Sequence, residues 1–376
     1  MSNYIVSARK YRPQTFEEVV GQEHITSTLE NAIKSDQLAQ SFLFCGPRGV
    51  GKTTCARILA REINKDSAQP NLLGEVDTST SMNIFELDAA SNNSVDDMRN
   101  LIDQVRFPPQ TGKYKVYIID EVHMLSASAF NAFLKTLEEP PPYAIFILAT
   151  TEKHKIIPTI LSRCQIFDFR RISPEDMVAH LKGICEQEGI TAEENALQII
   201  ATKSDGALRD ALSLFDRLVS SVGKTLTYED VLKNLNILDY DYYFKITDAL
   251  LQEDLPLAMT YYADIMKKGF EGDEFMLGLG EHFRNLLVCK DDRTIPLLEL
   301  SGDLKDRYVK QSDAASNNFL LNGMKFANDC DYQYKAHKNK RLLVELSLAK
   351  IAYSVSAVKA ALQPSEEQKK NSAVGA

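Results

Sequence analysis

The sequence has 376 residues, of which 44% are hydrophobic and 25% are charged, and its formal net charge at pH 7 is −9. This length predicts two or three domains, and the composition excludes an intrinsically disordered chain. The negative charge argues against a protein that coats nucleic acid, so we expect any contact with DNA to be confined to a local surface.

The sequence contains no apolar run of membrane-spanning length, and its first residues lack the basic-then-apolar order of a secretory signal. Its six cysteines, at positions 45, 55, 164, 185, 289 and 330, never form a C-x-x-C pair. Neither a disulfide framework nor a thiolate metal site is therefore predicted. We expect a soluble, cytoplasmic protein.

Short β-like runs alternate with helix-like segments in the first part of the chain. The runs are SFLFC (41–45), IFELD (84–88), KVYIID (115–120), AIFILAT (144–150) and QIFDF (165–169). This alternation is typical of a parallel sheet that is covered by helices. We therefore expect an α/β domain over residues 1–172.

Helical patterns replace the strand signals after this domain. Ser173 and Pro174 have the residue types of an N-cap and a first helical position, and they open an expected small helical domain, 173–236. A larger helical domain is expected over 237–363, followed by a polar tail or linker over 364–376. Near the end of the larger domain, one helical stripe contains Leu342, Leu346, Ala349 and Tyr353.

The segment GPRGVGKT, residues 46–53, matches the phosphate-binding loop pattern in full and lies between a predicted strand and a predicted helix. Its glycines allow backbone N–H groups to turn toward phosphates, and the helix adds its positive end. Lys52 would contact the β- and γ-phosphates, and Thr53 would bind Mg²⁺. The alternative is a glycine-rich turn with a surface lysine. The candidate nucleotide-binding residues of this segment are Gly46, Pro47, Arg48, Gly49, Val50, Gly51, Lys52, Thr53 and Thr54.

Two acidic residues end the third predicted strand, in VYIIDEVHML. Asp120 follows a buried strand, where an unpaired carboxylate is costly and Mg²⁺ is a suitable partner. Glu121 is placed to polarise an attacking water, which favours ATP hydrolysis over simple binding. The alternative is a strand that ends in two solvated acids.

Three segments carry a resemblance to a known family. They are ARKYRPQTFEEVVGQEHI (8–25), ELDAASNNSVDDMR (86–99) and IIDEVHMLSASAFNAFLKTLEEPPPYAIFILATTEKHKIIPTILSRCQIFDFRRI (118–172). Together they resemble the bacterial DNA polymerase III gamma/tau subunits, the motor subunits of clamp loaders within the AAA+ group. The resemblance is close from residue 4 to about residue 220 and loose over the remainder.

The resemblance implies an α/β AAA+ domain, a helical lid over 173–236 and an all-helical oligomerisation collar over 237–363. It implies an ATPase that uses ATP and Mg²⁺ to open a sliding clamp and load it onto primer-template DNA. The implied partners are the clamp, subunits of the delta and delta prime type, and further copies of this chain. Whether the chain is a full product or the motor part of a longer protein stays open, and in the second case polymerase and helicase would bind the missing C-terminal region. We expect the chain itself to carry no polymerase active site.

The resemblance also implies roles for residues outside the phosphate-binding loop. Thr151, with Thr150 as the alternative, would be sensor 1 and would orient the water or the γ-phosphate. Arg163, in SRC, would be an arginine finger that reaches ATP held by the neighbouring subunit, and Arg209, in GALRDAL, would be sensor 2. The candidate contacts to the adenine and ribose are Arg9, Tyr11, Arg12, Pro13 and Val20.

For DNA, the resemblance implies that the helix beginning near SNNSVDDMR lines a central pore, with Asn92, Asn93 and Arg99 as candidate contacts. Such side chains suit phosphate contacts that carry no sequence information. The alternative is an ordinary helix whose N-cap is Ser94.

One segment departs from the family pattern, which usually includes four zinc-binding cysteines after the phosphate-loop helix. Here the segment is INKDSAQPNLLGEVDTSTSMN, 63–83, which contains neither Cys nor His. A Cys₄ zinc site cannot form without thiolates, so we predict no structural zinc.

Two other functions stay open. One is a non-hydrolysing clamp-loader scaffold that resembles delta prime, and the intact GPRGVGKT and DE motifs argue against it. The other is a different AAA+ remodeller, such as a helicase loader or a Holliday-junction motor, and the SRC and EEPPP segments argue against that.

Overall fold

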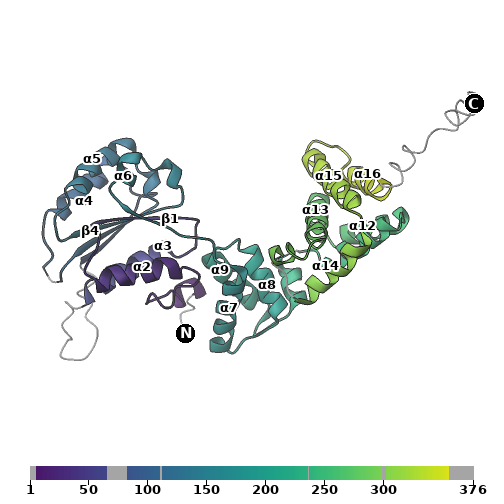
Figure 1. Cartoon of the computed structure of the whole chain (residues 1–376), viewed down its shortest axis with the longest axis horizontal. Helices are drawn as coiled ribbons and strands as arrows, with labels where there is room; N and C mark the ends of the chain where they lie inside the picture. Colours follow the sequence, from purple (N-terminus) through teal and green to yellow (C-terminus); the bar gives the residue numbers. More distant parts are fainter. Residues whose placement is uncertain (1–5, 66–82, 111, 236, 299–301, 355–376) are drawn as a thin grey trace, which may run out of the picture. The chain divides into compact units, whose positions relative to one another are not determined.

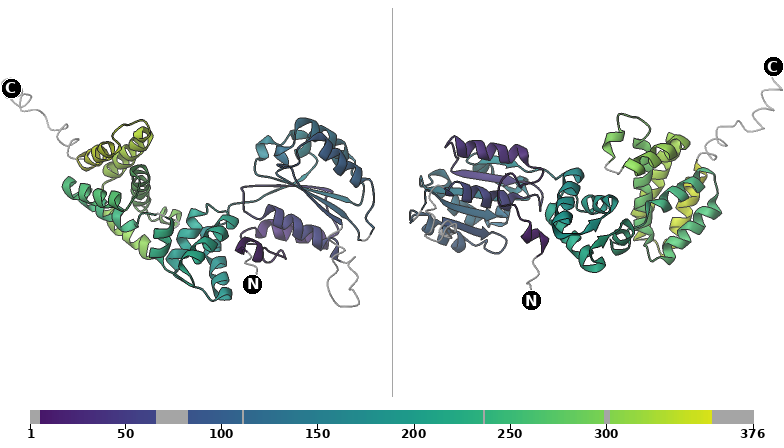
Figure 2. Two further views of the ribbon diagram at one scale, coloured as in Figure 1. Left: turned by 180° about the vertical axis from the view of Figure 1, so that it is seen from behind. Right: turned by 90° about the horizontal axis from the view of Figure 1, so that it is seen from below.

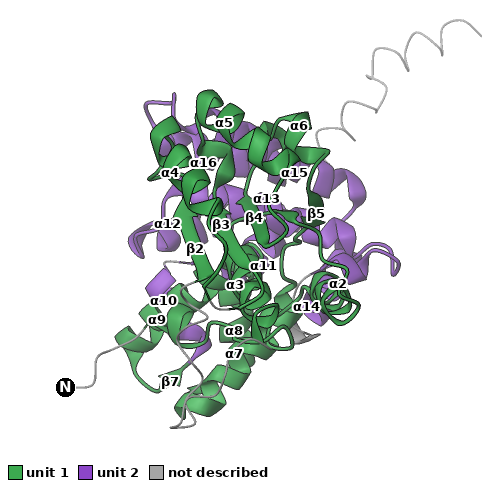
Figure 3. Cartoon of the chain, turned by 90° about the vertical axis from the view of Figure 1, so that its left-hand side faces the viewer, with its two compact units in different colours: residues 1–226 green, residues 227–376 purple. Residues whose placement is uncertain are grey.

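The computed structural model describes residues 6–65, 83–110, 112–235, 237–298 and 302–354 (Figure 1). The chain divides into two units, residues 1–226 and 227–376, which are coloured separately in Figure 3. In the part of the chain that the structure describes, no helix combines the length and the apolar character needed to span a bilayer. The predicted tail, 364–376, lies outside the described residues.

The first unit contains a five-stranded parallel sheet with the strand order β2-β3-β4-β1-β5. The strands are β1 (Ser41–Cys45), β2 (Ile84–Asp88), β3 (Lys115–Asp120), β4 (Ala144–Thr150) and β5 (Gln165–Asp168). The five predicted strands and their parallel arrangement are thus confirmed. In the register, Cys45 pairs with Thr150 and Asp88 with Asp120, so the carboxyl ends of β1, β2, β3 and β4 lie along the same edge of the sheet.

Helices cover both faces of this sheet (Figures 1 and 2). One face packs against α2 (Glu23–Lys34) and α3 (Lys52–Glu62), and the other against α4 (Val95–Val105) and α5 (Ala127–Glu138). Strand β1 contributes side chains to the hydrophobic core on each face. Phe42 and Phe44 point to the first face, and Leu43 and Cys45 point to the second. Burial on both faces explains why the three inner strands, β3, β4 and β1, are continuous apolar runs. The short elements here are α1 (Ser7–Lys10), η3 (Val122–Met124), η4 (Lys153–Lys155) and α6 (Pro158–Leu161).

The rest of the first unit is mainly helical and includes one pair of two-residue strands. It contains α7 (Pro174–Glu188), β6 (Thr191–Ala192), α8 (Glu194–Lys203), α9 (Leu208–Val222) and β7 (Thr225–Leu226). The predicted start of α7 is confirmed, because the Ser173 hydroxyl accepts a hydrogen bond from the N–H of Asp176 at 3.1 Å and Pro174 is the first helical residue. Helix α9 buries Ala211, Leu212, Phe215 and Leu218 on one face.

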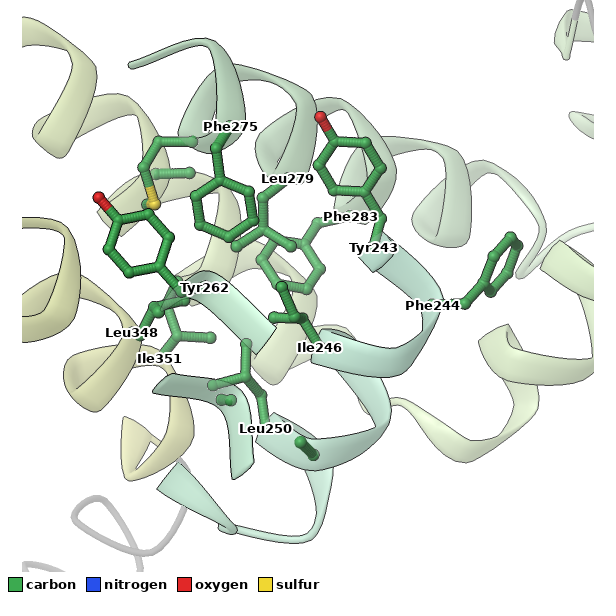
Figure 4. Close-up of a cluster of buried hydrophobic side chains, with 14 of the residues drawn as sticks. Tyr243, Phe244, Ile246, Leu250, Tyr262, Phe275, Leu279, Phe283, Leu348 and Ile351 are labelled. Atoms are coloured by element: carbon green, nitrogen blue, oxygen red, sulfur yellow. The ribbon is translucent and has the colours of Figure 1, made fainter. Parts of the chain in front are cut away.

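The second unit is all-helical in its described residues. Its elements are α10 (Tyr228–Leu235), α11 (Tyr240–Leu251), α12 (Leu255–Lys267), α13 (Gly272–Val288), η5 (Ile295–Leu297), α14 (Gly302–Ala314), α15 (Asn317–Tyr334) and α16 (Lys340–Ala352). Figure 4 shows the rings of Tyr262, Phe275 and Phe283 grouped with aliphatic side chains in its core. His282 is also buried, with Nδ1 at 3.0 Å from the Tyr308 hydroxyl and Nε2 at 2.8 Å from Oε1 of Gln311. Burial lowers the pKa of His282 to about 4, so its ring is uncharged at neutral pH.

The stripe identified in the last helix lies on the exposed side of α16. Leu342, Leu346 and Tyr353 are exposed, whereas Val344, Leu348 and Ile351 enter the core. Both sets recur at helical spacing, so periodicity alone does not select the buried face.

We expect Gly323→Ala to destabilise the second unit. A Cβ at this position of α15 would lie 2.7 Å from ring carbons of the fully buried Phe283. Overpacking of this kind costs about 1–3 kcal/mol, which outweighs the gain of about 1 kcal/mol in helix propensity. Urea titration followed by circular dichroism measures the change. The matched control is Gly183→Ala in α7, where a Cβ would meet nothing within 4 Å, and this variant should be slightly stabilised. Equal stability of Gly323→Ala and the parent would contradict the tight contact between α13 and α15.

Candidate active site

The phosphate-binding loop requires glycine for its backbone path. Gly46, Gly49 and Gly51 have φ angles of 146°, 77° and 103°, which side chains disfavour. A Cβ on Gly46 would lie 2.5 Å from the carbonyl oxygen of Phe169, and one on Gly49 would lie 3.0 Å from the Cβ of Ala207. Helix α3 begins directly after this loop, so its first N–H groups are available to an anion.

Lys52 lies inside the loop with only 6% of its surface exposed. Its Nζ donates hydrogen bonds to the carbonyl oxygens of Gly46 at 2.8 Å and Pro47 at 2.6 Å. Burial lowers the pKa of Lys52, while the carboxylates of Glu121 and Asp120 act in the opposite direction. The ammonium group is therefore held where phosphates bound by the loop would lie.

Thr53 and Asp120 form a pair of hard oxygen ligands. The Thr53 hydroxyl donates to Oδ2 of Asp120 at 2.6 Å, and Oδ1 of Asp120 accepts from the N–H of Glu121 at 3.0 Å. Within the described ranges, no cluster of three or more His, Cys, Asp or Glu side chains could hold a metal ion by itself. This donor set fits Mg²⁺, which commonly combines one or two protein oxygens with substrate phosphates and water.

Glu121 has an unusual backbone and an anchored carboxylate. Its φ is 47°, a left-handed conformation that is rare for residues other than glycine. Its Oε2 accepts hydrogen bonds from the hydroxyl of Thr151 at 2.9 Å and from the Thr151 N–H at 3.3 Å. Thr150 is fully buried, and its hydroxyl lies 3.1 Å from Nδ1 of His123. The two threonines therefore differ in geometry, because only Thr151 bonds directly to Glu121.

A cavity of about 740 Å³ brings most of the candidate residues together. Its size is within the usual range for small-molecule sites. The candidate residues along its wall are Arg9, Tyr11, Arg12, Pro13, Val20, Arg48, Gly49, Val50, Gly51, Lys52, Thr53, Thr54, Asp120, Glu121 and Arg209. Three other candidates do not line the cavity but are hydrogen-bonded to residues that do: Gly46 and Pro47 to Lys52, and Thr151 to Glu121.

The N-terminal side of the cavity is anchored to α7 and α9. The Tyr11 hydroxyl bonds to Glu188, and both the N–H and the hydroxyl of Ser7 bond to Asp216. On the other side, the N–H of Arg209 donates to the carbonyl of Gly49 at 3.4 Å. Burial lowers the pKa of Arg12, and the nearby cations Arg57 and Arg209 add to this effect. This cationic wall suits an anionic ligand.

Arg163 is not part of this cavity wall. It follows α6, and its guanidinium donates to Oε1 of Glu138 and to the carbonyl of Thr159, both at 2.6 Å. The side chain is 32% exposed, so it is accessible from outside the chain.

The three candidate DNA contacts lie near the start of α4. The helix has a capping box in which the Ser94 hydroxyl and the Asp97 carboxylate bond to each other's backbone N–H groups. Arg99 is exposed and pairs with Asp96 at 3.2 Å. Asn93 is exposed, and Asn92 donates from its side chain to the carbonyl of Asp88. The capped helix is therefore present, while contact with DNA stays a prediction.

Sequence reasoning missed His123, Glu152 and Arg57 as site residues. The ring of His123 lies between the carboxylates of Glu121 and Glu152. Arg57 borders the cavity and donates from Nε to Oε1 of Glu86 at 2.7 Å. Only their positions in the sequence could have indicated a role at the site, because His123 follows Glu121 by two residues and Arg57 is one helical turn beyond Thr53.

Residues 66–82 of the cysteine-free insertion lie outside the described residues, so the expected absence of zinc there stays a prediction.

Two family models match the chain. The model "DNA polymerase III, delta subunit" matches residues 21–173, and "DNA polymerase III clamp loader subunit, ATPase lid domain" matches residues 176–223. The tau subunit of DNA polymerase III from Bacillus subtilis is 39% identical over 93% of this chain and 63% of its own length. The gamma subunit from Buchnera aphidicola (subspecies Baizongia pistaciae) is 42% identical over 70% of this chain and 74% of its own. The tau subunit from Escherichia coli is 40% identical over 74% of this chain, which spans only 45% of that relative.

Solved structures give weaker similarity. The RuvB Holliday junction branch migration motor of Thermotoga maritima has a TM-score of 0.48 at 23% identity, covering 64% of this chain and 79% of that one. The clamp loader delta protein (YqeN) of Bacillus subtilis has a TM-score of 0.38 at 16% identity, covering 87% of this chain and 99% of that one.

Proposed function

The chain belongs to the DNA polymerase III gamma/tau subunit family of clamp loaders, and we propose that it is an ATP-hydrolysing motor that loads a sliding clamp onto primer-template DNA. The observation that carries the proposal is the arrangement at one cavity of Lys52, the Thr53–Asp120 pair and the Glu121–Thr151 pair. A cation, a metal-binding oxygen pair and an anchored base are the groups that phosphoryl transfer to water needs.

In the proposed reaction the chain binds ATP, positions a water and receives its proton. The loop N–H groups and Lys52 hold the phosphates, and Arg209 contacts the γ-phosphate from α9. Mg²⁺, held by Thr53, Asp120 and phosphate oxygens, would neutralise charge that develops during transfer. Thr151 fixes one oxygen of Glu121, and the carboxylate accepts a proton from the water. The water oxygen bonds to the γ-phosphorus while the bond from that phosphorus to the β,γ-bridging oxygen breaks, and this oxygen leaves with ADP. ADP and inorganic phosphate are the products.

Assembly would complete the site. We assign residues 1–172 to the motor domain, 173–236 to the lid and 237–363 to the collar that joins subunits. The proposed partners are the clamp, subunits of the delta and delta prime type and further copies of this chain, acting in the cytoplasm. The arc of subunits would hold the clamp open when ATP is bound and release it on DNA after hydrolysis.

The experiment is steady-state ATP turnover by the chain mixed with clamp-loader partners, with and without clamp and primer-template DNA. We expect strong stimulation that requires both additions, because each would help to align the bound subunits for hydrolysis. Turnover that is indifferent to clamp and DNA would favour another AAA+ remodeller. No turnover under any condition would favour a non-hydrolysing scaffold.

A further inference from the structure

His123 closes a small hydrogen-bonded ring beside Glu121. Its side chain is 7% exposed, with Nδ1 at 3.1 Å from the Thr150 hydroxyl and Nε2 at 3.1 Å from Oε2 of Glu152. The N–H of Glu152 in turn donates to the Thr150 hydroxyl at 3.0 Å. The imidazole tautomer with its hydrogen on Nε2 satisfies all of these contacts, since it accepts from Thr150 and donates to Glu152.

The ring encloses the residue that holds the proposed base. Thr151 lies between Thr150 and Glu152, and both its hydroxyl and its N–H donate to Oε2 of Glu121. The Nδ1 of His123 lies 3.5 Å from the same oxygen, which is packing contact rather than a hydrogen bond. Glu121 borders the cavity, and within the described residues its Oε1 has no hydrogen-bond partner. Oε2 of Glu121 is therefore anchored by Thr151, and Oε1 is available to a water in the cavity.

Glu152 is suited to hold the far side of the ring. Lys155 lies 2.6 Å from its Oε2, and this hydrogen bond keeps the pKa of the Glu152 carboxyl below its ordinary value. Glu152 therefore remains an acceptor for Nε2 of His123. One imidazole thus contacts the side chains on both sides of Thr151, those of Thr150 and Glu152.

We propose that His123 is a positioning residue for Glu121. His123 holds the Thr150–Glu152 turn in place, so that Thr151 orients the Glu121 carboxylate toward the attacking water. This inference rests on the proposed function, because it assigns a task only if Glu121 is the base. His123 is not part of the cavity wall, so it would touch neither the nucleotide nor the water. Its effect reaches the reaction through the direction of one carboxylate, and small displacements of a catalytic group can cost about 10²-fold in rate.

The test compares turnover and nucleotide binding in the full chain. We expect His123→Ala to lower kcat about 10- to 100-fold while the KM for MgATP and the Kd for a fluorescent ATP analogue stay within about twofold. His123→Gln, whose amide can still donate to Glu152, should recover part of kcat. The matched control is His154→Ala, because this histidine is 76% exposed and lies 4.0 Å from Oε1 of the same Glu152. It should retain wild-type kcat.

A double-mutant cycle separates positioning from a general structural effect. In the Glu121→Gln background, His123→Ala should change the residual turnover by less than about twofold, because the group that it positions is already gone. An undiminished effect in that background, or a normal kcat in folded His123→Ala, would overturn the inference. If circular dichroism shows that His123→Ala does not fold, kcat, KM and Kd are compared between His123→Gln and wild type. The kcat of His123→Gln should then lie below that of wild type, and an equal kcat would overturn the inference.

The turnover of Glu121→Gln separates a failure of the His123 role from a failure of the proposed function. Wild-type turnover that is lost in Glu121→Gln supports the proposed base whatever the His123 variants do. Unaltered His123 variants alongside an inactive Glu121→Gln would remove only the role of His123. Normal turnover in Glu121→Gln would overturn both.

Discussion

Glu121→Gln is expected to bind MgATP as tightly as the wild-type chain and to hydrolyse it about 10²- to 10⁴-fold more slowly, the range typical of general-base catalysis. The substituted amide has the same shape and can still accept a hydrogen bond from Thr151, but it cannot take up the proton of the water. Binding should persist because neither Lys52 nor the Thr53–Asp120 pair is hydrogen-bonded to this carboxylate.

Equilibrium binding of a fluorescent ATP analogue and single-turnover hydrolysis measure the two effects separately. The control is Glu194→Gln in α8, whose carboxylate is 70% exposed and pairs with Lys182. Normal hydrolysis in Glu121→Gln would remove the base assignment, and a large loss of binding would show that the carboxylate instead supports the nucleotide site.

Arg163→Ala is expected to reduce the turnover of the assembled complex by about 10³- to 10⁵-fold, the effect of arginine fingers in GTPases. A guanidinium beside the transferred phosphoryl group neutralises charge that develops in the transition state. Within its own chain Arg163 is paired with Glu138 and lies outside the cavity wall, so ATP binding by the same chain should be unchanged. The control is Arg293→Ala, since Arg293 is 88% exposed and also pairs with an acid of its own chain, Asp291.

A mixing experiment tests whether Arg163 acts on a neighbouring subunit. When Glu121→Gln and Arg163→Ala chains are assembled together, some interfaces contain an intact Glu121 from one chain and an intact Arg163 from the other. Turnover should therefore rise above that of either variant alone. If Arg163 served its own site, no interface would be complete and mixing would restore nothing.

The core of the fold could be predicted because its signals are local. The three inner strands β1, β3 and β4 are short apolar runs, as in residues 144–150, and burial on both sheet faces makes such runs continuous. The phosphate-binding loop is equally local, since its glycines, Lys52 and the start of α3 follow one another along the chain. A pattern of this kind needs no knowledge of distant residues to be identified.

Contacts between distant segments could not be predicted in the same way. Tyr11 and Glu188 are 177 residues apart, and Ser7 and Asp216 are 209 residues apart, yet each pair is hydrogen-bonded. No local periodicity encodes which residue of α7 or α9 faces the N-terminal segment. These contacts depend on how the helices pack against the rest of the unit.

By itself the sequence determined the five parallel strands, the phosphate-binding loop and the two acids at the end of β3. Only the tertiary structure decided that Thr151 bonds to Glu121 while Thr150 bonds to His123, and that His123 lies between Glu121 and Glu152. It also decided that Val344 and Leu348, rather than Leu342 and Leu346, enter the core. The physical reason is common to these cases: neighbouring residues carry the same local signal, and their environments differ only because other elements pack on one side of them.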